Sequence, residues 1–540
     1  MDINPELSRT LWSNEVPTPI EATLIQGQVN TIMGRMSTLQ AELQRLEEGL
    51  RLNRGALSFI RWLPPEILAE IFSDLVAGIL DWEGREVVLG LGLVCKSWRR
   101  ATLSSHRLWT SISVNRHQCN ETSHAKIVTW LDRSGDLSKT VELDHSNLDW
   151  CECDLEPAED TEEERGPCQM NNPTLTKLLS TGPKLHKLIL RCSSQWCLRT
   201  LLEGIGPETS VTNRRPWDML QALEVKLTME DYCPWEEPLD ASKSLFCYLP
   251  QVTSLELHIP DAWVAFEVNF TAARTVALNI PPRLLQGLKT FTLHCDWEGS
   301  HILEMLQHCQ NVESLAIDFR GASLQHDEND TLTQQLAATR LLLPKIHTLY
   351  LNSAANVNIL DFLHTPTLRD LHLDMEYNGY SIPGQPIAFR EPLLRFIQAS
   401  DCQETLISLH MQNLKTDPAE LAHTFLNLPF LRKITLDCCR SQTDTFWQHM
   451  WRFARKDRES GDSPLCLPLL QELQTLHIPA DGSVFRFVAD FIRDSRARNC
   501  SPFSWKLSYA QATLPEEAMK QKVVKLERNG VSLQILPSQL

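Results

Sequence analysis

The sequence predicts an α/β protein in which an N-terminal helical module precedes an irregular solenoid of strand–helix repeats. Three patterns support this fold class: apolar residues at heptad spacing over 25–50, helical apolar stripes within 61–114, and a short apolar motif that recurs along the rest of the chain. The chain has 540 residues, of which 42% are hydrophobic and 22% charged. This is enough apolar material for an ordered core. If the chain is built from repeats, neighbouring repeats would share one continuous core.

Charge and cysteine content restrict the function. Lys and Arg number 51 against 68 Asp and Glu, so the net charge is −17 and the pI is near 5.5. An acidic chain is a poor generic binder of nucleic acid or anionic membranes, since both attract clustered Lys and Arg. The start, MDINPELSRT, does not resemble a signal peptide, no apolar run is long enough to span a bilayer, and the 16 Cys are too sparse for a disulfide scaffold. We expect a soluble intracellular protein, cytoplasmic or nuclear or both, with mostly reduced thiols.

Residues 21–60 carry a heptad pattern, after a segment, 1–20, that we expect to be disordered. Eight apolar residues are spaced alternately by four and three positions: Ile25, Val29, Ile32, Met36, Leu39, Leu43, Leu46 and Leu50. This spacing predicts one helix with an apolar seam. The seam could pack on the rest of the chain or form a coiled coil with a second copy. The intramolecular interpretation is favoured, because few complementary charges flank the seam and Gly27, Gly34 and Gly49 each weaken a free helix by about 1 kcal/mol.

The segment 61–114 predicts three short helices. Trp62-Leu63-Pro64-Pro65-Glu66 is typical of a helix start, where proline loses no hydrogen bond and a carboxylate complements the helix dipole. A second apolar stretch over 87–94 leads into Cys95-Lys96-Ser97-Trp98, and a third segment ends at Leu108-Trp109. A module of this size buries little core of its own and often keeps apolar surface for a partner. The first helix carries one apolar stripe, formed by Ile67, Leu68, Ile71, Phe72 and Leu75.

In order and spacing these blocks resemble the F-box, and the preceding heptad-patterned helix is similar to the arrangement in fungal F-box proteins. The resemblance rests on Leu63-Pro64-Pro65-Glu66-Ile67-Leu68, Ile71-Phe72, Val94-Cys95-Lys96-Ser97-Trp98-Arg99 and Leu108-Trp109. It implies that the module docks on the Skp-family adaptor of a cullin–RING ubiquitin ligase. Carried over residue by residue, it implies the adaptor-binding positions Leu63, Pro64, Ile67, Leu68, Ile71, Val94, Cys95 and Trp98. For Phe72 and Trp98, packing inside the module is favoured over adaptor contact.

Beyond residue 114 the pattern apolar-x-x-apolar-x-apolar recurs ten times. Its alternation predicts a half-buried strand, and apolar residues spaced three and four apart between units predict helices. Such units describe a leucine-rich-repeat solenoid over 115–540. Unit spacing varies from 22 residues (Ile346 to Leu368) to 42 (Leu431 to Leu473), so the solenoid should be irregular; separate α/β domains are the alternative. The units are Leu185/Leu188/Leu190, Leu220/Leu223/Val225, Val252/Leu255/Leu257, Leu288/Phe291/Leu293, Val312/Leu315/Ile317, Ile346/Leu349/Leu351, Leu368/Leu371/Leu373, Leu406/Leu409/Met411, Leu431/Ile434/Leu436 and Leu473/Leu476/Ile478.

Within each unit, the residue between the last two apolar positions should point to the opposite face of the strand. The row formed in this way is polar and mixed in sign, which suits protein recognition better than phosphate binding. The alternative is that these are solvated strand positions without a ligand. The candidate target-binding residues are Glu224, Glu256, Tyr350, His372, His410 and His477.

Signs of chemistry are weak. Residues 152–164 hold eight carboxylates and should form a solvated acidic insertion. Cys151, Cys153, Cys168 and His145 lack the paired spacing of a zinc site, so no metal is expected. No phosphate-binding glycine loop, zincin helix or nucleophile elbow occurs, which argues against an enzyme and against a cofactor.

Together the patterns predict the substrate-recognition subunit of an SCF-type ubiquitin ligase, acting in ubiquitin-dependent protein degradation. The F-box would bind the adaptor and the solenoid would bind a target protein, while other subunits transfer ubiquitin. The alternative is an interaction scaffold with the same two binding regions and no role in ubiquitination. Neither nucleic acid nor a membrane is expected as a partner, and self-association through Ile25–Leu50 is possible but not favoured.

Overall fold

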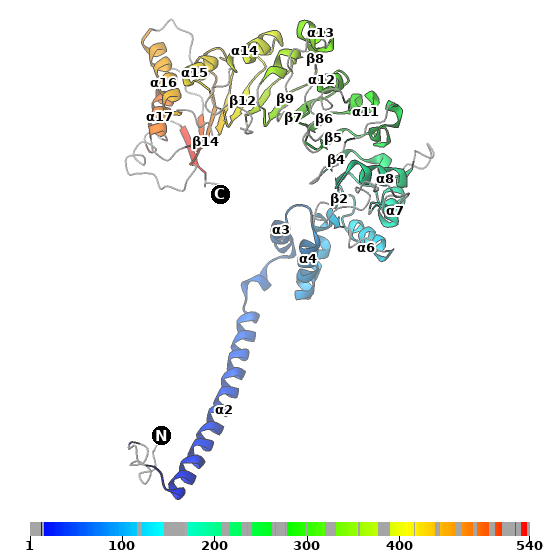
Figure 1. Cartoon of the computed structure of the whole chain (residues 1–540). Helices are drawn as coiled ribbons and strands as arrows, with labels where there is room; N and C mark the ends of the chain where they lie inside the picture. The colour runs from blue at the N-terminus through cyan, green and yellow to red at the C-terminus, as the bar shows by residue number, and fades with distance from the viewer. Residues whose placement is uncertain are drawn as a thin grey trace. The chain divides into compact units, whose positions relative to one another are not determined.

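A computed structural model describes the chain as two compact units (Figure 1). The first comprises Met1–Leu75 with Val88–Ser105, and the second Val76–Val87 with His106–Leu540. Apart from a few single positions, the described residues are 16–115, 121–144, 170–206, 215–227, 240–261, 278–297, 301–318, 331–354, 357–375, 389–414, 416–437, 443–460, 467–478, 483–495, 503–509 and 531–536.

The first unit begins with α2 (Pro19–Ala56), a helix of 38 residues. A capping box starts it: the Glu21 amide donates to Thr18 Oγ1 at 3.4 Å, and the Thr18 amide donates to Glu21 Oε2 at 2.8 Å. Its start lies inside the segment 1–20 that was expected to be disordered; residues 1–11 lie outside the described part of the chain.

The apolar seam of α2 is exposed. No described residue of the helix is buried, and seven of the eight seam residues are between 39% and 66% exposed. No described residue of its own unit therefore covers this seam, and the favoured expectation that it packs on the rest of the chain stays a prediction. Heptad spacing shows that one face of a helix is apolar, but it does not show what covers that face.

The remainder of the first unit is built from short helices: η1 (Phe59–Trp62), α3 (Pro65–Leu75), most of α4 (Trp82–Val94) and α5 (Lys96–Ser104). Leu68 and Phe72 of α3 are buried, as are Val88 of α4 and Ala101 of α5. Phe72 packs against Trp98 of α5 with ring centroids 5.0 Å apart, which ties the first helix to the third.

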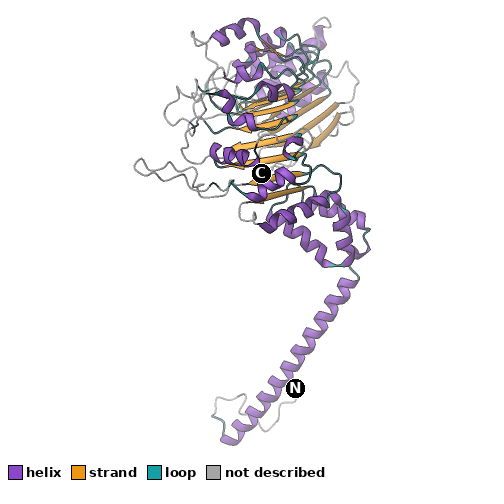
Figure 2. Ribbon diagram, turned by 90° about the vertical axis from the view of Figure 1, so that its right-hand side faces the viewer, coloured by secondary structure: helices purple, strands orange, loops and turns teal. Residues whose placement is uncertain are grey.

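The second unit is organised around one parallel sheet of 14 strands whose spatial order follows the sequence. Because parallel neighbours need a crossover connection, helical segments alternate with the strands and lie along one side of the sheet (Figures 1 and 2). The strands are β1 (Ser111–Asn115), β2 (Thr140–Asp144), β3 (Lys187–Cys192), β4 (Ala222–Leu227), β5 (Ser254–His258), β6 (Thr290–His294), β7 (Ser314–Asp318), β9 (Thr348–Asn352), β11 (Asp370–Asp374), β12 (Ser408–Gln412), β13 (Lys433–Asp437), β14 (Glu472–Ile478), β15 (Phe503–Tyr509) and β16 (Val531–Ile535).

The helical segments of this unit differ in length from repeat to repeat. Two short strands, β8 (Leu341–Leu342) and β10 (Leu363–His364), also pair in parallel outside the main sheet. The helices are η2 (His106–Trp109), α6 (Glu121–Asp132), α7 (Pro173–Thr181), α8 (Gln195–Ile205), η5 (Trp217–Met219), η6 (Ala241–Lys243), η7 (Leu245–Tyr248), α11 (Pro282–Gly287), α12 (His301–Leu306), α13 (Thr331–Thr339), η8 (Asn358–Phe362), α14 (Arg390–Ala399), α15 (Pro418–Leu426), α16 (Thr443–Ser460) and α17 (Ser483–Ser495).

The repeating motif sets the register of the sheet. Leu188 pairs with Leu223, and Leu223 with Leu255, and all three are buried on the helical side. The alternate residues face the other way, so Glu224 pairs with Glu256. A slip of one residue would exchange the two faces, and the apolar positions therefore specify the pairing.

The last motif was assigned to the wrong residues. In β14 the positions paired with Ile434 and Leu436 are Leu473 and Thr475, so the unit ends on Thr475 and not on Leu476. Thr475 is buried, and its hydroxyl accepts a hydrogen bond of 3.0 Å from Trp505 Nε1. A polar residue that is satisfied inside the core does not show in a hydrophobic pattern.

The structure describes eight cysteines, all as free thiols, five of them buried. Burial raises the pKa of both Cys309 and Cys402 to about 12. The acidic residues 152–164, with His145, Cys151 and Cys153, lie outside the described residues. Among the described helices, none combines the length and the apolar character needed to cross a membrane.

Candidate functional site

Helix α3 exposes part of its apolar stripe. Ile67 and Ile71 are 48% and 44% exposed, Pro64 is exposed just before the helix, and Leu63 is half-buried. Leu68 is only 1% exposed. The expectation that Leu68 faces an adaptor is therefore wrong: it lies one residue beyond Ile67, about 100° around the helix, and belongs to the module's own core.

The junction of α4 and α5 holds the other candidate positions. Val94 ends α4 and is 60% exposed, Cys95 is exposed at the N-cap of α5, and Trp98 is half-buried against Phe72. Leu89 and Leu93 of α4 are also exposed, at 50% and 81%. Sequence reasoning missed these two leucines because they lie in a continuous apolar run, which gives no indication of which side faces solvent.

The opposite face of the sheet from the helices carries a row of mostly polar side chains, which we call the strand-face row. Register pairing joins Glu142, Ile189, Glu224, Glu256, Thr292, Ala316, Tyr350, His372, His410 and Thr435 across neighbouring strands. The pairing brings together five of the six residues predicted to bind a target. Glu142 of β2 extends the row and was not a candidate, because its strand is not among the ten units of the repeating motif.

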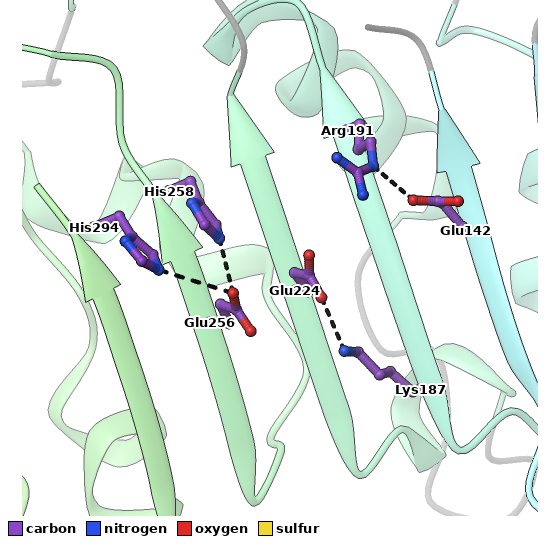
Figure 3. Close-up of polar contacts among 7 residues, drawn as sticks. All are labelled: Glu142, Lys187, Arg191, Glu224, Glu256, His258 and His294. Atoms are coloured by element: carbon purple, nitrogen blue, oxygen red, sulfur yellow. Dashed lines mark hydrogen bonds and ion pairs between the residues drawn. The ribbon is translucent and has the colours of Figure 1, made fainter. Parts of the chain in front are cut away.

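At the N-terminal end of the row, acidic residues are paired with basic ones (Figure 3). Arg191 Nε donates to Glu142 Oε1 at 2.6 Å, and Lys187 Nζ lies 2.9 Å from Glu224 Oε2. Both pairs join adjacent strands, with the two basic residues on β3 and the two acidic residues on β2 and β4.

Glu256, the next acidic residue of the row, lies close to the imidazoles of His258 and His294 (Figure 3). His258 Nε2 lies 2.8 Å from Glu256 Oε1, and His294 Nε2 lies 3.9 Å from the same oxygen. The hydrogen bond with His258 lowers the pKa of the Glu256 carboxyl, against the opposing effect of burial. The other ring nitrogen of His294, Nδ1, lies 3.2 Å from Asp318 Oδ2.

Glu256, His258 and His294 could each offer one ligand atom to a metal, since these atoms lie within 4.8 Å of one another. The two imidazole rings, however, are stacked with centroids 3.9 Å apart and planes 10° apart. An imidazole binds a metal along its in-plane lone pair, and the lone pairs of stacked rings run side by side. A shared metal would require one of the rings to rotate.

The centre of the row is an aromatic cluster of Tyr350, His372 and His410, contributed by β9, β11 and β12. Tyr350 stacks on His372 with centroids 4.1 Å apart, and His372 Nδ1 lies 3.1 Å from His410 Nδ1. All three side chains are half-buried. Burial, followed by the neighbouring His410 and Lys433, lowers the pKa of His372 to about 4, so this ring is neutral near pH 7.

His477, the sixth candidate, does not join the row. The register of β14 shifts between Thr475 and Ile478, and His477 has a φ of 50°. Gln474 occupies its place opposite Thr435, followed by Lys506 of β15. His477 Nδ1 instead lies 2.6 Å from Asp437 Oδ1, while Lys506 Nζ lies 2.9 Å from Glu472 Oε1.

Comparison with known protein families finds one match. Residues 60–115 match the family model of the F-box-like domain. The match covers the end of η1, the three helices of the module and strand β1. The chain therefore contains an F-box-like domain over these residues. No curated protein matches the chain in sequence.

Proposed function

We propose that this protein is the non-enzymatic, target-binding subunit of an SCF-type cullin–RING ubiquitin ligase. Its F-box-like domain binds a Skp-family adaptor, and its strand-face row binds the protein to be ubiquitinated. The observation that carries the proposal is the outward apolar pair Ile67 and Ile71 within the F-box-like domain. F-box domains typically bind adaptors of this family.

Two features of the module support the adaptor side. Leu68 and Phe72 are buried on one side of α3, while Ile67 and Ile71 remain exposed on another. The helix thus has an internal core of its own and an apolar surface left for a partner, the pattern expected of an interface core. Exposed Leu89 and Leu93 on α4 extend the apolar surface available within the same unit.

The test is binding of the purified chain to a purified Skp-family adaptor, measured by calorimetry. Removing two interface anchors, Ile67→Ala with Ile71→Ala, should weaken binding at least about tenfold, which corresponds to about 1.4 kcal/mol. The matched control is Leu342→Ala with Leu469→Ala, since these leucines have similar exposure, 47% and 40%, outside the F-box-like domain. Circular dichroism shows whether each variant remains folded. If the wild-type chain does not bind the adaptor at tens of micromolar, the proposed function is wrong.

On the target side, we propose that the sheet and its helices form an irregular leucine-rich-repeat solenoid whose strand-face row is the recognition surface. The regular register of the motif across successive parallel strands supports this interpretation. The row has an aromatic cluster at its centre and paired charges at both ends. Protein interfaces commonly combine a central aromatic anchor with a polar surround, and tyrosine is enriched among such anchors.

The target side is tested by quantifying co-purified proteins from cells that express the wild-type chain, Tyr350→Ala or Tyr248→Ala. Tyr248, 41% exposed in η7, supplies the same substitution away from the strand face. A target should be lost with Tyr350→Ala and retained with Tyr248→Ala. Addition of the reconstituted ligase then separates the two roles: ubiquitination of that target supports the receptor, and stable binding without ubiquitination favours the scaffold.

A further inference from the structure

Helix α2 is a long helix whose apolar seam is not covered by any described residue of its own unit. At 1.5 Å per residue its 38 residues span about 57 Å. In heptad terms, its a positions are Ala22, Val29, Met36, Leu43 and Leu50, and its d positions are Ile25, Ile32, Leu39, Leu46 and Asn53. Nine of these ten core positions are apolar.

The glycines of α2 show where its stability must come from. Gly27, Gly34 and Gly55 occupy f positions, on the side away from the seam, and Gly49 occupies a g position at its edge. Glycine in a helix interior disfavours an isolated helix, and most helix stability in proteins comes from packing of the apolar face. The glycines leave that face intact, so the seam is the part of α2 able to provide this packing.

The charges at the edges of the seam discriminate between partner orientations. In a parallel pair of identical helices, a g residue faces the e residue five positions later on the other copy. This places Glu42 against Glu47 on both sides of the dimer, and the remaining g–e′ contacts contain no opposite charges. A parallel homodimer therefore contains repulsive edge contacts and no compensating ones.

An antiparallel pair of the same helices has the opposite property. In the best alignment, each core residue lies opposite the residue of the second copy for which the two residue numbers add to 75. Every a position then faces a d position, so all ten core positions are paired, with Met36 opposite Leu39 at the centre. Arg35 then lies beside Glu42 of the second copy, and by symmetry this attractive contact occurs twice. Sliding by one heptad removes two core layers and places either Arg35 against Arg35 or Glu42 against Glu42.

We propose that α2 forms an antiparallel two-stranded coiled coil with a second copy of this chain, centred between Met36 and Leu39. The seam that is exposed in one chain becomes the core of the dimer, and the Arg35–Glu42 pairs set its orientation and register. The proposal is independent of adaptor or target binding. It depends on the exposure of the seam, the core matching and the charge complementarity of a single helix.

The test is sedimentation equilibrium of the full chain and of three variants: Arg35→Glu, Glu42→Arg and the double variant that carries both substitutions. The wild type should approach twice the chain mass of 61.6 kDa, which is 123.2 kDa. Glu42→Arg places two arginines against each other in the antiparallel dimer, so its dissociation constant should rise at least about tenfold. In a parallel dimer the same substitution would remove the Glu42–Glu47 repulsion and tighten association.

The double variant Arg35→Glu with Glu42→Arg should restore dimerisation, because the pair is re-formed with its charges exchanged. Arg45→Glu is the matched control for Arg35→Glu, since Arg45 occupies a c position away from the interface and should leave the mass unchanged. A wild-type chain that stays monomeric at tens of micromolar would overturn the proposal. A dimer that Glu42→Arg strengthens would overturn the antiparallel orientation. If Arg35→Glu, Glu42→Arg and the double variant all leave the dissociation constant unchanged, the chains associate through another surface and the proposal is wrong.

Discussion

His372 Nδ1 lies 3.1 Å from His410 Nδ1 across the paired strands β11 and β12. Two identical ring nitrogens form a hydrogen bond only when one carries the proton and the other accepts it, so at least one ring is neutral. Burial lowers the pKa of both imidazoles, and the Tyr350 ring stacks on the His372 ring. The centre of the strand-face row is thus neutral and aromatic at physiological pH, between ends at which charges are paired.

The first prediction concerns stability against acid. His301 of α12 is 4% exposed, and burial lowers its pKa to about 4. In the unfolded chain it takes up a proton near pH 6.5, whereas in the folded chain it does so only near pH 4. Its contribution to stability is therefore complete above pH 6.5 and declines as the pH falls toward 4, by up to about 1.4 kcal/mol per pH unit.

His301→Leu should reduce the pH dependence of the free energy of unfolding between pH 6.5 and 4, as measured by urea denaturation at several pH values. The stability of the variant relative to the wild type should rise as the pH falls. His372→Leu should act in the same direction with a smaller effect, because His372 is partly accessible to solvent. A constant difference between His301→Leu and the wild type across this range would contradict the assignment.

The second prediction separates core from surface on α3. Leu68→Ala should destabilise the F-box-like domain by about 2–5 kcal/mol, because it leaves a cavity beneath the helix. Ile67→Ala, on the exposed side of the same turn, should change its stability by less than about 1 kcal/mol. Hydrogen exchange of the amides in α3 and α5 measures both effects, and equal loss of protection in the two variants would mean that Ile67 is also part of the core.

The third prediction concerns the buried hydrogen bond from Trp505 Nε1 to Thr475 Oγ1. Thr475→Val keeps the side-chain volume but leaves the buried indole N–H without this acceptor, which should cost about 1–3 kcal/mol of stability. Thr475→Ser retains the hydroxyl and serves as the control, with a smaller loss from the missing methyl group. Should chemical denaturation show valine to be no worse than serine, the hydrogen bond is not important to the stability of this repeat.

Much of the architecture follows from short-range sequence pattern. The motif ending at Leu188 and Leu190 recurs as Leu223 and Val225 and specifies both strand position and register, because side chains alternate between the faces of a strand. The pattern does not predict the position of β14, where the buried residue is a threonine whose hydroxyl finds a partner 30 residues away. The exposure of Leu89 and Leu93 is likewise invisible in a continuous apolar run.

By itself, the sequence determined where most of the repeating strands form, which residues lie between the core positions of those strands, and that residues 61–114 resemble an F-box. Only the tertiary structure decided which of these residues meet. Register pairing brings Tyr350, His372 and His410 together from strands 22 and 38 residues apart. Burial removes Leu68 from the exposed face of α3, and the described residues of its own unit leave the seam of α2 uncovered. Local spacing depends on backbone geometry within a few residues, whereas contact and burial depend on segments that are distant in the chain.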